Sequence, residues 1–92
     1  MNSTKKTGYL LTLDQHCIET TARRNHQRLM DQLLESAEPA PEVSESLELL
    51  RTFLEQQDFP AIRSAHPDLA GGTGVRVRIF RDPQGLVTWE KI

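Results

Sequence analysis

Residues 75–92 read VRVRIFRDPQGLVTWEKI, and this stretch decides the fold. The β-branched residues Val75, Val77 and Ile79 alternate with residues of a second face. That second set is Arg76, Arg78 and Phe80. A period of two predicts a β-strand. Residues 82–85, Asp-Pro-Gln-Gly, have the composition of a type I turn closed by a glycine in the left-handed conformation. The sequence therefore predicts a C-terminal β-hairpin with a three-residue loop.

The turn also predicts how the two strands pair. A three-residue loop places Asp82 opposite Leu86, and it follows that Ile79 faces Trp89 and Arg78 faces Glu90. In this register one face of the hairpin collects the apolar side chains Val75, Val77, Ile79, Val87 and Trp89. A shift of one residue would separate them, so turn and hydrophobic pattern support the same register. A lone hairpin is marginal in water, and we expect this face to pack on helices.

The segment from Thr12 to Ser36 has the pattern of a helix. Its apolar side chains follow i, i+4, i+7 spacing, and Thr12 with Gln15 fits a capping box. The β-branched residues at 18, 20 and 21 weaken the first turns. The alternative is a helix that begins near Thr20, with residues 8–13 forming a short strand.

Two more helices are expected before the hairpin. Pro39 interrupts the chain, and Pro41 suits the first turn of a second helix, from Pro41 to Gln57, which runs antiparallel to the first. Asp58 can cap a short third helix over residues 59–65. Pro67 stops that helix, and the glycine-rich residues 68–74 are expected to form a connecting loop.

These elements predict a single α+β domain over residues 1–92. An antiparallel helix pair and a short third helix pack on the C-terminal hairpin, with a third, N-terminal strand as the alternative. Residues 1–7 are polar and without pattern, and we expect them to be disordered.

Hydrophobic residues make up 37% and charged residues 26%, as in ordinary globular domains. One cysteine permits no internal disulfide, and no apolar run is long enough for a signal peptide or membrane span. We therefore expect a soluble, cytoplasmic protein.

The side chains that most often catalyse or bind metals are few and scattered. They are His16, Cys17, His26 and His66. None has the paired spacing that zinc sites require, and no cofactor motif is present. The glycines at 71, 72 and 74 precede a strand, whereas phosphate-binding loops precede a helix. We expect a non-catalytic protein without cofactor or metal; a nucleophilic role for Cys17 is the least favoured alternative.

The second face of the hairpin has the composition of a contact surface. It is expected to present Arg76, Arg78, Phe80, Leu86 and Ile92. Apolar groups bordered by arginine are typical of protein interfaces. The competing interpretation is that another segment, such as residues 9–13, covers this face. The acidic side chains of the second helix add a surface that could dock a basic partner, including a second copy of this chain.

The sequence thus predicts a protein-interaction or adaptor domain that binds a protein partner or forms a homodimer through the outer hairpin face. The alternative is a small nucleic-acid-associated regulator. It would use arginines of the first helix and the hairpin, namely Arg23, Arg24, Arg28, Arg76 and Arg78. A formal net charge of −2 and the pairing of Glu90 with Arg78 argue against nucleic acid.

Overall fold

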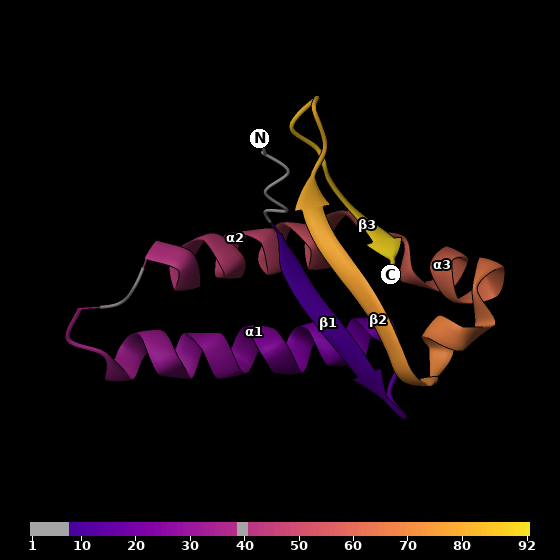
Figure 1. Ribbon diagram of the computed structural model, residues 1–92, viewed down its shortest axis with the longest axis horizontal. Helices are drawn as coiled ribbons and strands as arrows, with labels where there is room; N and C mark the ends of the chain where they lie inside the picture. The colour runs from indigo at the N-terminus through magenta and orange to yellow at the C-terminus, as the bar shows by residue number, and fades with distance from the viewer. Residues whose placement is uncertain (1–7, 39–40) are drawn as a thin grey trace.

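The chain folds into an antiparallel sheet that is covered on one side by helices (Figure 1). The computed structural model describes residues 8–38 and 41–92. The elements in chain order are β1 (Tyr9–Asp14), α1 (Ile18–Glu35), α2 (Pro41–Gln56), α3 (Phe59–Ala65), a 3-10 turn (Pro67–Ala70), β2 (Thr73–Arg81) and β3 (Val87–Lys91). The strand order is β1-β2-β3, and the α+β class predicted from the sequence is confirmed.

The C-terminal hairpin has the predicted register. Ile79 pairs with Trp89 and Arg78 with Glu90. At the turn, the Asp82 amide donates to the Leu86 carbonyl at 2.8 Å. Gly85 has φ +88°, the left-handed conformation that glycine adopts without strain. The turn chemistry and the hydrophobic pattern therefore suffice to define this part of the fold.

The expected start of the first helix is wrong, and the alternative is correct. Residues 9–14 form strand β1, which pairs with β2, and α1 begins only at Ile18. Gln15 lies between them at φ +68°, so a helix cannot run through this position. Leu11 and Leu13 are both fully buried, which is the period of two of a half-buried strand. Burial of these two leucines and pairing with β2 outweigh the capping pattern of Thr12 and Gln15.

The other two helices are confirmed with small corrections. α2 ends at Gln56, one residue before the predicted end. The Asp58 carboxylate accepts a hydrogen bond from the Ala61 amide at 3.2 Å, as expected for the cap of α3. Pro67 stops α3 but begins a 3-10 turn, so only part of the expected loop at residues 68–74 lacks regular structure. The predicted disorder of residues 1–7 and the break at Pro39 lie outside the described residues.

The core lies between the sheet and the helices. α1 and α2 run antiparallel behind the strands, and α3 follows near β3 (Figure 1). Val77 and Ile79 are fully buried, and Trp89 packs against the same cluster. Across from them, Phe53 of α2 meets Phe59 of α3 edge-to-face, with ring centroids 5.4 Å apart. Because the helices of the described residues cover one face only, the other face of the sheet is a candidate surface.

Candidate functional site

The face of the sheet that lies away from the helices contains three strands, whereas the face predicted from sequence contains only the two strands of the hairpin. β1 lies beside β2 rather than over it, so residues 9–13 do not cover this face. The pairing of Leu10 with Arg78 and of Thr12 with Arg76 places Leu10 and Thr12 on the same face as the two arginines. We call this surface the outer face; its side chains are Leu10, Thr12, Arg76, Arg78, Phe80, Leu86, Thr88, Glu90 and Ile92.

Large apolar side chains are exposed on the outer face. Leu10 is 45% exposed, Leu86 57% and Ile92 64%. Phe80 is half-buried, and the guanidinium group of Arg78 lies over its ring. Leu10 was not predicted as part of the site, because the sequence pattern from Thr12 onward favours a helix. The alternation of Tyr9-Leu10-Leu11-Thr12-Leu13 is the signal that could have placed it there.

Arg78 lies at the centre of the outer face in a fixed position. Its Nε donates to Oε2 of Glu90 at 2.9 Å, and a second guanidinium nitrogen binds the same oxygen. The guanidinium carbon lies 4.4 Å from the centroid of the Phe80 ring. The ion pair and the stacked ring hold the arginine flat against the sheet. Arg76, by contrast, is exposed and has no ion pair among the described residues.

A shallow hollow of about 480 Å³ lies on the outer face near the chain's last residues. It is lined by Gly8, Leu10, Arg78, Glu90, Lys91 and Ile92. Leu10 and Ile92 thus flank the Arg78–Glu90 pair, which gives the hollow apolar sides around a paired charge. All five residues predicted for protein binding lie on this one face: Arg76, Arg78, Phe80, Leu86 and Ile92.

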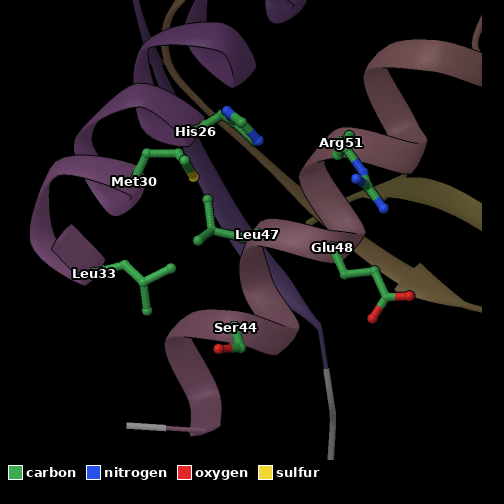
Figure 2. A pocket seen from close by; sticks show the side chains of 7 residues that line it. All are labelled: His26, Met30, Leu33, Ser44, Leu47, Glu48 and Arg51. Carbon is green, nitrogen blue, oxygen red and sulfur yellow. The ribbon is translucent and has the colours of Figure 1, made fainter. Parts of the chain in front are cut away.

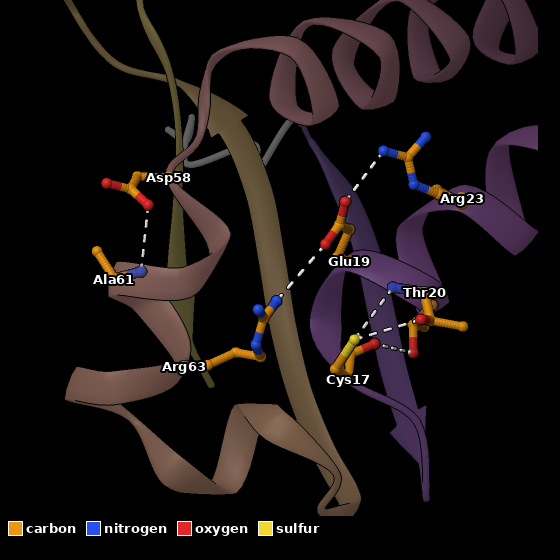
Figure 3. Close-up of polar contacts among 8 residues, drawn as sticks. Cys17, Glu19, Thr20, Arg23, Asp58, Ala61 and Arg63 are labelled. Atoms are coloured by element: carbon orange, nitrogen blue, oxygen red, sulfur yellow. Dashed lines mark hydrogen bonds and ion pairs between the residues drawn. The ribbon is translucent and has the colours of Figure 1, made fainter.

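The arginines of α1 do not join those of the hairpin. Arg23 forms an ion pair with Glu19 at 3.0 Å, and Glu19 also meets Arg63 of α3 at 3.5 Å (Figure 3). Arg24 contacts His16, and Arg28 contacts the hydroxyl of Tyr9. These groups belong to the helical side, whereas Arg76 and Arg78 lie on the outer face. The five arginines predicted for nucleic acid therefore form two separate groups.

Cys17 caps α1 rather than lying inside a helix. Its Sγ accepts a hydrogen bond from the Thr20 amide at 3.4 Å and lies 3.3 Å from the Thr20 hydroxyl (Figure 3). Partial burial acts to raise the pKa of the thiol, but hydrogen bonds from Thr20 and Glu19 and the charge of Arg63 oppose it. The net result is a pKa below the ordinary value.

His16 directly precedes Cys17 in the chain, whereas His26 and His66 lie in other parts of the fold. His66 packs edge-on against Trp89, with ring centroids 5.1 Å apart. His26 lines a hollow of about 400 Å³ between α1 and α2, together with Met30 and Leu33 (Figure 2). Within the described residues, no three histidine, cysteine or acidic side chains are grouped as they would be around a metal. Nor does that part of the chain contain a helix of the length and apolarity that crossing a bilayer requires.

The comparisons with known proteins place the chain in a family. A protein-family model matches residues 8–88, from just before β1 into β3. An uncharacterised protein of Archaeoglobus fulgidus is 38% identical over 83 residues, which cover 88% of this chain and 95% of that relative. No solved structure matches the chain. The chain belongs to the family that the matching model describes, and the aligned region covers nearly the whole length of the archaeal relative.

Proposed function

We propose that this protein is a non-catalytic interaction domain that binds a protein partner through the outer face. The observation that supports this most directly is the exposure of Leu10, Leu86 and Ile92 on the side of the sheet without helices. Exposed apolar side chains that are scattered singly need no explanation, but here they share one face around a fixed arginine. Such a mixture is typical of the centre of protein interfaces.

The chemistry of this face indicates what the partner presents. Leu86 and Ile92 would pack against an apolar surface of the partner, and exposed Arg76 would pair with one of its carboxylates. Arg78 is held against Phe80 before binding, so little of its conformational freedom remains to be lost. The interface would therefore combine apolar contact with charge pairing at its edge.

A second copy of this chain has a surface of the required charge. Glu42, Glu45 and Glu55 are exposed on α2, whereas Glu48 already pairs with Arg81 of β2 at 3.6 Å. The exposed glutamates of one copy could face Arg76 of another. Self-association through the outer face is the form of this proposal that is simplest to test.

The experiment compares two charge insertions at exposed leucines. Leu86→Lys places a charge on the outer face, and Leu34→Lys places one on α1, where Leu34 is 76% exposed. We expect the native protein to form dimers or a complex with another protein by native mass measurement. Leu86→Lys should reduce that species, and Leu34→Lys should leave it unchanged.

Two results would contradict the proposal. One is a protein that stays monomeric to high micromolar concentration and forms no protein crosslink from a photoreactive group at position 86. The other is co-purified nucleic acid, seen in the ultraviolet absorbance ratio, whose salt-sensitive binding is lost on the double change Arg76→Ala and Arg78→Ala.

A further inference from the structure

The direction of the main-chain groups of β1 follows from two hydrogen bonds at the opposite side of the sheet. The Ile92 amide donates to the Arg76 carbonyl at 3.0 Å, and the Asp82 amide donates to the Leu86 carbonyl at 2.8 Å. In an antiparallel pair the N–H and C=O of one residue point to the same side, and successive residues alternate. Even-numbered residues of β2 therefore bond to β3, and odd-numbered residues bond to β1.

This alternation leaves polar main-chain groups at the open edge of β1. Tyr9 and Leu11, which face Ile79 and Val77, direct their N–H and C=O toward β2. The N–H and C=O of Leu10 and Thr12 accordingly point away from the sheet. Within the described residues, no strand pairs with this edge of β1.

The edge at β3 differs in having local protection. Gln57 of the α2–α3 connection donates its side-chain amide to the Val87 carbonyl at 3.2 Å, which occupies an edge acceptor. Lys91 pairs with Asp68 at 2.8 Å, and charged side chains on an edge discourage strand addition. β1 contains neither lysine nor proline; its charged residue, Asp14, and a shift in register after Thr12 are confined to the end of the strand. Buried Leu11 and Leu13 hold the strand in place, so the stretch from Tyr9 to Thr12 is fixed and is not paired on its open side within the described residues.

Two arginines of α1 contact side chains at or just beyond the ends of β1. A guanidinium nitrogen of Arg28 lies 3.3 Å from the hydroxyl of Tyr9, the first residue of the strand. A guanidinium nitrogen of Arg24 lies 3.2 Å from Nε2 of His16, two residues beyond the last. Both arginines are exposed, and neither forms an ion pair with a carboxylate among the described residues. Positive charge thus lies near both ends of β1, and Asp14, the last residue of the strand, offsets part of it at one end.

We propose that the edge of β1 binds an extended acidic segment of a partner protein, which adds to the sheet as a fourth strand. The main-chain groups of Leu10 and Thr12 would pair with it, and Arg24 and Arg28 would bind its carboxylates. This proposal concerns the edge and does not depend on the outer face being a binding surface.

A second copy of this chain is a poorer occupant of the edge. Pairing β1 with the β1 of another copy would bring Arg24 and Arg28 of both chains to one seam. Like charges placed together across paired strands are destabilising. An acidic segment carries no arginines to repel Arg24 and Arg28, and its carboxylates would neutralise the charge of these two residues.

The test uses a fluorescent eight-residue peptide, Glu-Thr-Val-Thr-Val-Thr-Val-Glu, whose binding to the full chain is followed by fluorescence anisotropy. A matched peptide has lysine at both ends. We expect the glutamate peptide to bind at least about tenfold more tightly than the lysine peptide. Equal affinities, or no binding of the glutamate peptide up to about 1 mM, would overturn the proposal.

Variants of the chain test the two kinds of contact separately. Thr12→Pro removes an N–H that points away from the sheet, and proline is tolerated on edge strands. Thr12→Val keeps the N–H and is the matched control. We expect Thr12→Pro to weaken peptide binding at least about fivefold, the value of one hydrogen bond, and Thr12→Val to change it little. Unchanged binding by a folded Thr12→Pro variant would refute strand addition.

The charge contacts are tested on α1, so that the outcome does not depend on how the strand tolerates proline. Arg24→Gln combined with Arg28→Gln should remove the preference for the glutamate peptide, whereas Arg23→Gln should preserve it because Arg23 pairs with Glu19. A preference that survives the double change would contradict the proposal. Leu86→Lys should not affect the peptide, which separates this test from that of the outer face.

Discussion

Replacing two neighbouring leucines of β1 by alanine should have very different effects on stability. Leu11 is fully buried and Leu10 is 45% exposed, although they are adjacent in sequence. Truncation of a fully buried leucine costs about 2–5 kcal/mol, because apolar contact is lost and a cavity remains. We expect about 3 kcal/mol for Leu11→Ala and about 0.5 kcal/mol for Leu10→Ala, since Leu10 keeps much of its contact with water in the folded state.

Urea unfolding followed by the fluorescence of Trp89 measures both losses. With a slope of about 1.5 kcal/mol per M, Leu11→Ala should lower the midpoint by about 2 M and Leu10→Ala by about 0.3 M. The comparison tests the strand itself, because a helix through these residues would not alternate between buried and exposed at every step. Equal losses for the two variants would refute the assignment of β1, and with it the open edge proposed above.

Three other changes test features outside β1. Gly85→Ala should destabilise the protein by about 1 kcal/mol in the same urea assay, because φ is +88° at the turn; no loss would argue against this turn. Cys17→Val should cost about 1 kcal/mol and Cys17→Ser much less, since serine keeps the cap of α1, and native Cys17 should react with iodoacetamide at lower pH than a free thiol. The hydrogen bond from Lys91 is the main cause that lowers the pKa of Asp68. The stability contributed by the ionised Asp68 carboxylate is therefore complete above about pH 4 and is lost as the pH falls through the lowered pKa. Lys91→Met should remove this dependence; a variant with the native acid profile of unfolding would contradict the assignment.

The hairpin could be predicted from sequence because independent local signals agreed. The Asp-Pro-Gln-Gly turn set the register, and the alternation of Val77, Ile79 and Trp89 supported the same register. The cap of α3 by Asp58 was also predicted, since an N-cap and the proline after it depend only on adjacent residues. Features fixed by a few neighbouring residues are those that sequence alone can determine.

β1 was harder to predict because its stability depends on residues about 65 positions away along the chain. Thr12 and Gln15 satisfy a local helix signal, and only pairing with β2 and burial of Leu11 and Leu13 outweigh it. The error also hid Leu10 from the predicted interaction site. The open edge could not be derived either, since it requires knowing which residues of β1 bond to β2.

The two proposed surfaces meet at Leu10 and Thr12, and this has a consequence for binding. These residues present their side chains on the outer face and their main-chain groups at the open edge. A strand added to β1 would place its own outward side chains beside Leu10 and so enlarge the outer face. We therefore expect the two sites to be coupled, and such coupling is reciprocal: a peptide at the edge changes the affinity of an outer-face partner by the same factor as that partner changes the affinity of the peptide. If the two affinities prove independent, binding at the edge and binding at the outer face are not coupled through Leu10 and Thr12; this prediction is then refuted, while each of the two proposals keeps its own test.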